Sequence, residues 1–209
     1  MHMLNKIRQY HKDYPDREAF FSIIGMHFPE GGADYRLIED AYELGKEAFR
    51  GIYREGNGER YFEHLRRVAL MILLHLRVID AEIIAASLLH DLVEDIDYWT
   101  HQKVSIRFSS RTGELVWWVS KPPKSNFDDN KEKRNHFFHH RLAEAPREPL
   151  IIKLPDRLDN NMNMWGLDTE KQIRKVEETK NFYLPLAEKH IILIHEMEDA
   201  LKENEERFL

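Results

Sequence analysis

The sequence contains no cysteine, few glycines and prolines, and no hydrophobic run long enough to span a membrane. The absence of cysteine excludes disulfide bonds and thiolate metal sites, so histidine, aspartate and glutamate are the candidate metal ligands. The most apolar run, residues 68–76, covers about half of a bilayer and is flanked by arginines, which predicts a buried helix. We therefore expect a soluble, cytoplasmic protein that does not bind a membrane.

The chain also lacks an excess of positive charge. Its 37 acidic and 31 basic residues give a net charge of −6, with no long block of lysine and arginine. Binding to nucleic acid is therefore not expected, and any anion must be bound by a local group of cations. With 209 residues, 42% of them hydrophobic, and no low-complexity tract or repeat, the chain can form one compact domain.

Apolar residues recur with helical spacing along most of the chain, and no alternating pattern of useful length predicts a strand. We therefore predict an all-α fold. Asp80 is expected to cap the helix that follows it, and Pro185 to break or kink the last helical region. The predicted helices cover residues 4–12, 16–27, 35–54, 60–77, 81–95, 100–108, 113–120, 131–144, 154–165, 170–184 and 186–206.

Four polar residues follow an apolar helical stretch in the segment LLHDLVEDID, residues 88–97. If the helix continues through this segment, His90 lies over Glu94, and Asp91 lies over Glu94 and Asp95. Three carboxylates within about one turn repel one another unless a cation, a helix end or solvent relieves them, and a divalent metal would do so best. The plainer interpretation is a solvated helix end with an ordinary hydrogen-bonded histidine, which a histidine–aspartate pair alone does not exclude.

Other segments supply matching ligands. His64 lies in YFEHLRRVA and Asp156 in KLPDRLDNN, while Arg54 stands on a loop that contains glycines. The helices that carry His64 and His90 form a predicted hairpin, in which an inclined crossing brings the two imidazoles together. Two imidazoles and two carboxylates leave positions open for water and substrate, as a hydrolytic metal site requires. Without sulfur ligands, manganese, iron, magnesium and zinc all remain open.

Several ordered segments resemble the HD hydrolase module of the RelA/SpoT homologue family, in particular its stand-alone small alarmone hydrolases. They read AYELGKEAFRGIYREGNGERYFEHLRRVA, AASLLHDLVED, FSSRTGELVWWVSKPPKS, LIIKLPDRLDN and EETKNFYLPLAEKH. The resemblance implies an all-α HD-domain phosphohydrolase helical bundle over residues 35–190. Residues 1–34 would then form an N-terminal helical extension, and residues 191–209 a C-terminal helix packed on the same domain or extending from it.

The resemblance also implies a small-molecule nucleotide substrate and a reaction. The reaction is hydrolysis of the 3′-pyrophosphate of guanosine tetra- or pentaphosphate, (p)ppGpp, to pyrophosphate and GDP or GTP. Glu94 and Asp95 match an acidic pair that positions or activates the attacking water. The implied cofactor is Mn²⁺ or another divalent metal, held by His64, His90, Asp91 and Asp156.

Four further residues match family positions around the substrate. Arg54 and Asn160 match positions that contact the nucleotide. Lys153 and Arg157 match a pattern in which a supporting role and direct contact with substrate are both open. Elsewhere, Lys121 and Lys124 are candidates for binding the anionic substrate, although surface lysines are the more common case.

Three departures from the family pattern concern substrate preference rather than hydrolysis. Glu55 stands where the family has lysine, Leu65 where it has proline, and Asp159 where it has histidine. Because Glu55 removes a positive charge near the nucleotide, ppApp, NADPH or a nucleoside phosphate stays open as the substrate. A non-catalytic nucleotide-binding module is a further alternative. The oligomeric state, including a homodimer, and the roles of the terminal helices also stay open.

Three other histidines are candidates for more ordinary roles. His136 and His140 have the helical spacing of a metal-binding pair, but no nearby carboxylate motif completes it. We therefore expect them on a polar helix face. His75 lies in an apolar stretch and is expected to be a hydrogen-bonded core histidine.

Overall fold

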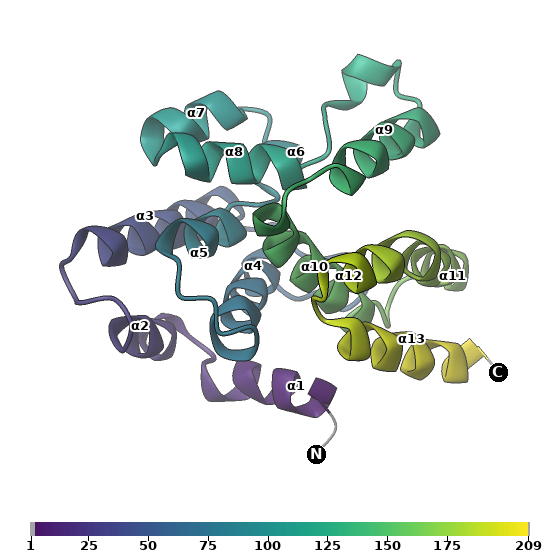
Figure 1. The fold of residues 1–209 in the computed structure, drawn as a ribbon, viewed down its shortest axis with the longest axis horizontal. Helices are drawn as coiled ribbons and strands as arrows, with labels where there is room; N and C mark the ends of the chain where they lie inside the picture. The colour runs from purple at the N-terminus through teal and green to yellow at the C-terminus, as the bar shows by residue number, and fades with distance from the viewer. Residues whose placement is uncertain (1–2, 209) are drawn as a thin grey trace.

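Helices account for all the regular secondary structure that the computed structural model describes, residues 3–208 (Figure 1). The one pairing of extended residues in this range is an isolated antiparallel bridge between Tyr53 and Arg60. The predicted all-α fold is therefore confirmed. Within the same range, no helix has both the length and the hydrophobicity needed to cross a membrane.

The first half of the chain, as far as residue 107, forms α1 (Met3–Asp13), α2 (Arg17–Gly25), α3 (Ala33–Ala48), α4 (Tyr61–Leu70), the π-helical η1 (Met71–His75), α5 (Ala81–Leu88), α6 (Leu92–Asp95) and α7 (His101–Arg107). The second half forms α8 (Ser110–Val119), the 3₁₀ turn η2 (Lys124–Phe127), α9 (Lys131–Ala143), α10 (Arg147–Met162), α11 (Thr169–Glu178), the π-helical η3 (Thr179–Tyr183), α12 (Leu184–His190) and α13 (Ile194–Phe208).

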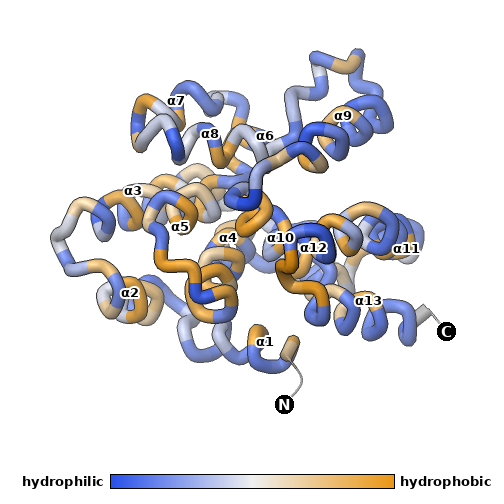
Figure 2. Tube along the Cα trace, in the orientation of Figure 1, coloured by the Kyte–Doolittle hydropathy of each residue, from blue (hydrophilic) through white to orange (hydrophobic). Residues whose placement is uncertain are grey.

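Helices α4, α5 and α10 lie at the centre of the molecule, and the other helices pack around them (Figure 1). Figure 2 shows hydrophobic residues on α4, α5 and the start of α10, whereas α11 and α13 are hydrophilic over much of their length. Leu150, Leu154 and Leu158 of α10 are completely buried. Each such side chain contributes about 1.5–3 kcal/mol by leaving water, so α10 is held firmly between its neighbours.

The two terminal helices pack on the same core. Leu4 and Ile7 of α1 and Met197 of α13 are all completely buried in it. Arg8 pairs with Glu203 at 2.5 Å, which joins α1 to α13 directly. The predicted division into residues 1–34, 35–190 and 191–209 stays a prediction.

Two predicted helices near the functional motifs have different ends in the structure. The helix predicted over residues 35–54 stops at Ala48, because the chain turns through Gly51 with a φ of +76°. The helix predicted over residues 81–95 is broken. It ends at Leu88, residues 89–91 form a turn, and α6 begins at Leu92. The hydroxyl of Ser120 donates to the carbonyl oxygen of His90 at 2.8 Å, so a contact with α8 replaces a helical hydrogen bond.

Two prolines also behave differently from prediction. Helix α10 starts at Arg147, before the predicted residue 154, and continues through Pro155. An internal proline costs a helix about 3 kcal/mol, which the burial of both flanking turns offsets. Pro185 lies in the first turn of α12, directly after η3, and does not break the helical path. The break comes at Ile191 and Leu193, which have φ values of +55° and +56°.

A glycine lets α3 pack closely against the end of α5. A Cβ atom added at Gly45 would lie 2.8 Å from the carbonyl oxygen of Leu88 and 3.1 Å from the ring of Phe62. Both distances are shorter than ordinary van der Waals contact. Gly45 therefore helps to fix the turn that follows α5 and carries the histidine–aspartate pair.

Candidate metal centre

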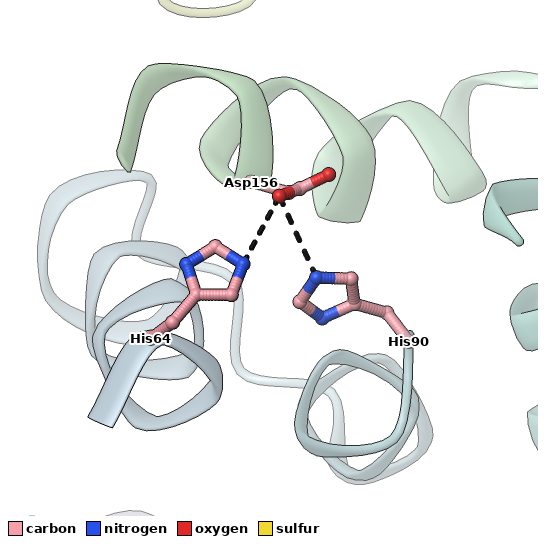
Figure 3. Close-up of side chains that lie close together, drawn as sticks. All are labelled: His64, His90 and Asp156. Atoms are coloured by element: carbon pink, nitrogen blue, oxygen red, sulfur yellow. Dashed lines mark ion pairs between the residues drawn. The ribbon is translucent and has the colours of Figure 1, made fainter. Parts of the chain in front are cut away.

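Three side chains from separate parts of the chain meet in the interior (Figure 3). His64 lies on α4, Asp156 on α10, and His90 in the turn between α5 and α6. Oδ1 of Asp156 lies 3.1 Å from Nε2 of His64 and 3.6 Å from Nε2 of His90. Among residues 3–208, this is the one group of three or more histidine, aspartate and glutamate side chains with the spacing of metal ligands.

Hydrogen bonds orient both imidazole rings. Nδ1 of His90 lies 2.7 Å from the carbonyl oxygen of Ser87, and because a carbonyl only accepts, Nδ1 carries the proton. Nδ1 of His64 lies 2.7 Å from Oδ2 of Asp159, which accepts in the same way. In its neutral form each ring therefore turns an unprotonated Nε2 towards Asp156, as a metal-binding histidine does. Nε2 of His90 is buried and has no hydrogen-bond partner in the described part of the chain.

Asp91 lies beside this group. Its Oδ2 is 3.3 Å from Nε2 of His90 and 3.7 Å from Nε2 of His64. The same oxygen accepts a 2.8 Å hydrogen bond from the hydroxyl of Tyr61. Tyr61 precedes His64 by three residues on α4, so the two side chains share one side of the helix. A ligand set that includes Asp91 stays a prediction, and its position next to both imidazoles is compatible with it.

Buried carboxylates dominate the electrostatics of the centre. Burial lowers the pKa of His90, but Asp91 and Asp156 outweigh it and raise the pKa to about 10. Burial raises the pKa of Asp91, yet His90 holds it below its usual range. The pKa of Asp156 is also held well below its usual value, against burial, by Lys153 and His90. The two carboxylates thus require a cation, and a divalent metal would take the place of the proton on His90.

The donor atoms fit a divalent metal ion. Neighbouring ligands of an octahedral ion with bonds of about 2.1 Å lie about 3 Å apart, close to the 3.1 and 3.6 Å that separate Asp156 from the two imidazoles. The unpartnered Nε2 of His90 gains a partner when an ion is bound. Imidazole and carboxylate ligands without sulfur are suited to manganese, iron and zinc.

Three of the predicted substrate-binding residues lie around Asp156. Nζ of Lys153 is buried 2.7 Å from Oδ2 of Asp156. The side-chain amide of Asn160 donates to Oδ1 of Asp156 at 2.6 Å, and Arg54 donates to the amide oxygen of Asn160 at 2.6 Å. Arg54 and Asn160 therefore also hold Asp156 in place, in addition to any contact with substrate.

Arg157, the fourth predicted substrate-binding residue, turns away from the centre. Its Nε donates to the hydroxyl of Thr179 at 2.7 Å, and its Nη1 lies 2.9 Å from Glu178. The guanidinium also lies over the ring of Tyr183, 4.5 Å from its centroid. These contacts join α10 to α11 and η3, which favours a supporting role for Arg157.

Asp159 is the most enclosed carboxylate next to the centre, with no exposed surface. Besides His64, it accepts hydrogen bonds from Nε of Arg67 at 2.6 Å and from Nη1 of Arg54 at 3.1 Å. Burial raises the pKa of Asp159, but Arg67 and His64 hold it well below its usual value. An ionised Asp159 thus orients the imidazole of His64 and balances the charges of the buried Arg67 and the partly buried Arg54.

Glu94 and Asp95 lie on α6, one turn beyond the histidine–aspartate pair. Oε2 of Glu94 accepts from the backbone N–H of Lys121 at 3.2 Å, and its Oε1 lies 3.4 Å from Nη2 of Arg134. Burial, Asp91 and Glu94 together raise the pKa of Asp95 to about 6. A carboxyl with such a pKa can exchange a proton near neutral pH.

Two cavities open beside these residues. Their combined lining carries more basic than acidic side chains, which suits an anionic ligand. The smaller cavity, of about 250 Å³, has a lining that includes Arg54, Glu55, Tyr61, Asn160 and Lys175. The larger cavity, of about 600 Å³, has a lining that includes Glu94, Asp97, Lys121, Lys124 and Arg134. Lys121 and Lys124 thus lie where an anion bound near Glu94 would meet them.

Sequence reasoning missed several residues of the centre. The spacing of Tyr61 and His64 placed them on one helix face and could have indicated the contact with Asp91. Asp159 stood out as a departure, but its role depends on Arg67, which lies 92 residues away. His75 was expected to be hydrogen-bonded, and its Nε2 lies 2.7 Å from Oε1 of Glu196.

Comparison with known proteins agrees with this geometry. Residues 41–192 match the family model described as HD domain. The chain belongs to the HD domain family. This family's model covers α4, α5 and α10, and therefore the whole of the histidine–aspartate centre.

Relatives with described activities lie within the same family. The chain is 36% identical over 161 residues to a guanosine-3′,5′-bis(diphosphate) 3′-pyrophosphohydrolase of Aquifex aeolicus, covering 77% of this chain and 22% of that protein. It is 32% identical over 188 residues to the bifunctional (p)ppGpp synthase/hydrolase SpoT of Escherichia coli K12, covering 89% of this chain and 26% of that protein. The chain thus spans about a quarter of the length of these relatives.

A solved structure confirms the HD-type helical bundle. It is that of a metazoan orthologue of SpoT, described as hydrolysing ppGpp. The two structures agree with a TM-score of 0.65 at 21% sequence identity, over 80% of this chain and 94% of the other. At this level of identity the likeness concerns the fold alone.

Proposed function

We propose that the protein hydrolyses the 3′-pyrophosphate of (p)ppGpp to GDP or GTP and pyrophosphate, with Mn²⁺ as the cofactor. The observation that carries the proposal is the buried group of His64, His90 and Asp156, in which Nε2 of His90 has no hydrogen-bond partner in the described chain. The sequence identity of 32–36% to (p)ppGpp hydrolases supports the same reaction.

In this proposal four residues hold the metal, namely His64, His90, Asp91 and Asp156. A bound divalent ion lowers the pKa of its water towards neutrality and offsets charge on the phosphate. Asp159 keeps the imidazole of His64 in the orientation that directs Nε2 inwards. Lys153 neutralises Oδ2 of Asp156, whereas Oδ1 faces the two imidazoles.

In this proposal the acidic residues of α6 accept the proton that the attacking water loses. Glu94 borders the larger cavity, where the backbone N–H of Lys121 and the guanidinium of Arg134 orient its carboxylate. Asp95, whose carboxyl lies next to Glu94 on the same helix, can accept a proton from the attacking water and pass it on to solvent. Hydrolysis then forms a bond from the water oxygen to the phosphorus next to the 3′-oxygen. The bond from that phosphorus to the 3′-oxygen breaks, and the 3′-oxygen takes up a proton.

In this proposal each of the two cavities binds one part of the substrate. The pyrophosphate group lies towards Lys121, Lys124 and Arg134, whose charges match it. The nucleoside part lies in the smaller cavity, near Arg54 and Asn160. An anionic small molecule is thus bound by a local group of cations on a protein whose net charge is negative.

One observation favours a second candidate substrate. Glu55 at the edge of the smaller cavity is paired with Lys171 at 2.5 Å, so the charge of this lysine is already compensated where a 5′-phosphate would lie. NADPH or a nucleoside phosphate, with less negative charge there, fits such an edge better than guanosine pentaphosphate does, whereas ppApp carries the same phosphates as guanosine tetraphosphate and fits it equally well. The hydrolytic chemistry would be the same.

The test is to incubate the purified protein with guanosine tetraphosphate and Mn²⁺ and to quantify GDP and pyrophosphate by chromatography. We expect both products in equal amounts, and none with a chelator or with the Asp91→Ala variant. ppApp and NADPH serve as parallel substrates. Absence of products from all three nucleotides, with Mn²⁺ bound to the protein, would overturn the proposed hydrolysis and leave a nucleotide-binding module.

A further inference from the structure

A third cavity, separate from the metal centre, lies between the start of α2, the C-terminal half of α3 and the N-terminal half of α4. Its volume is about 490 Å³. The acidic side chains in its lining are Asp16 and Glu63. The basic side chains in its lining are more numerous, namely Arg17, Lys46, Arg50, Arg60 and Arg66. This excess of positive charge is local, because the whole chain carries a net charge of −6.

Carboxylates beside the cavity compensate part of this positive charge, since Arg17 is paired with Glu43 at 2.5 Å and with Glu39 at 2.6 Å. Glu63 is shared, since one of its oxygens lies 2.6 Å from Arg60 and the other contacts Arg66. Lys46 forms no ion pair within residues 3–208 and is exposed. Arg50 is paired with Glu47, but both side chains are largely exposed, so solvent screens the pair. An anion in the cavity would therefore meet Lys46 first, together with arginines whose carboxylate partners are shared or screened by solvent.

Arg66 adds a buried and unsatisfied donor to this cavity. Its side chain is only 8% exposed, and its Nε has no hydrogen-bond partner in the described chain. Leaving such a donor without an acceptor is unfavourable, and more so for a charged group. Two other contacts hold the side chain in place, one with Glu63 and one with the hydroxyl of Tyr42. A phosphate oxygen would give this guanidinium the acceptor that it lacks.

We propose that this cavity is a second anion site, which binds the diphosphate group of a small phosphorylated compound. Guanidinium groups bind phosphate oxygens in pairs of hydrogen bonds, and a lysine adds a mobile charge. The volume is sufficient for a diphosphate with an attached nucleoside, and Phe49 and Phe62 supply apolar lining on one side. The shared chemistry is the diphosphate, whether it is free pyrophosphate or part of a nucleotide.

The second anion site lies next to the metal centre without sharing a metal ligand with it. The ring of Phe49, which lines the cavity, stacks on the ring of Tyr61 with 4.6 Å between centroids and 8° between planes. The hydroxyl of Tyr61 in turn donates to Asp91. Two aromatic rings thus separate the cavity from the metal centre, so binding at the two places can be observed independently.

Nuclear magnetic resonance of the full chain can locate the site. The ¹⁵N-labelled protein would be titrated in metal-free buffer at low salt with inorganic pyrophosphate and, separately, with GDP. We expect saturable shifts of the backbone amides of residues 46–51 and 60–66 in both titrations. Shifts confined to the residues around Lys121, Lys124 and Arg134 would place all binding at the metal centre and overturn the second site.

Two variants sharpen the test. Lys46→Gln removes one cation of the cavity at an exposed position, so the fold should be retained, and we expect binding there to weaken about fivefold or more. Lys202→Gln, an exposed lysine on α13, is the matched control and should leave the dissociation constant unchanged. Equal affinity of both variants and the unmodified protein would contradict the proposal. Tighter binding of GDP than of pyrophosphate would show that the site recognises a nucleotide. Equal affinity for the two would show that it recognises the diphosphate alone.

Discussion

The carboxylate of Asp159 lies 2.7 Å from Nδ1 of His64, although 95 residues separate the two in the chain. This contact connects α10 to α4 at the point where the candidate metal ligands meet. It fixes which nitrogen of His64 carries the proton, and so directs the other nitrogen at Asp156. Asp159 thereby acts on the centre through His64, without facing the metal position itself.

The first prediction concerns this contact. Asp159→Asn keeps the size of the side chain but removes its charge, so the imidazole of His64 loses basicity and orientation. We expect the affinity for Mn²⁺ to fall by about tenfold or more, measured by calorimetric titration. Arg67→Lys is the control, because it changes the other donor to Asp159 and keeps the carboxylate that accepts from His64. If both variants bind Mn²⁺ like the unmodified protein, Asp159 does not position His64.

Asp91→Ala should remove a metal ligand. The variant leaves two imidazoles with one carboxylate, so we expect both Mn²⁺ binding and turnover to be lost. Calorimetry for the metal and chromatography for the products would measure the two effects. Because Tyr61 loses its acceptor in this variant, circular dichroism should confirm that the helical content is retained. Full activity of a variant shown to be free of metal would contradict the assignment of the centre.

Glu94→Gln should separate metal binding from catalysis. The amide keeps the shape of the side chain but cannot accept a proton, and Glu94 is not among the candidate ligands. We expect unchanged affinity for Mn²⁺ and a kcat lower by about 10²–10⁴-fold. Glu132→Gln, on the exposed side of α9, is a matched control with no expected effect. An unchanged kcat in Glu94→Gln would exclude Glu94 from proton transfer.

His11 on α1 predicts a pH dependence of stability. Burial lowers the pKa of His11 to about 4, and neither ring nitrogen has a hydrogen-bond partner in the described chain. The unfolded chain takes up this proton near pH 6.5, whereas the folded protein does so only near pH 4. The free energy of unfolding should therefore fall by about 3 kcal/mol on this account as the pH drops from 6.5 to 4.

Urea denaturation at a series of pH values would measure this effect. His11→Leu removes the titrating group but keeps apolar volume against the core. We expect the loss of stability between pH 6.5 and 4 to be smaller in the variant by roughly the same 3 kcal/mol. Parallel curves of stability against pH for the two proteins would show that His11 has the same pKa in the folded and unfolded states, contrary to the prediction.

Much of the fold and the centre was predictable from local patterns. Helical periodicity predicted the all-α fold, and the resemblance of the motifs around His64, His90 and Asp156 to the RelA/SpoT homologue family implied that these residues meet. Such patterns can be interpreted from the sequence because a helix places side chains at known angles and each ligand type limits the metals that it binds. The exclusion of thiolate ligands likewise needed only the composition.

The tertiary structure decided the features that depend on long-range contacts. The turn after Leu88 forms where the hydroxyl of Ser120, directly after α8, donates a hydrogen bond to the carbonyl oxygen of His90. Local helix propensity does not reveal this contact. Similarly, α10 continues through Pro155 because burial on several sides outweighs the missing hydrogen bond. Asp159 became a partner of His64 only when α10 packed on α4. In each case the free energy comes from residues far apart in the chain, and no local sequence pattern contains it.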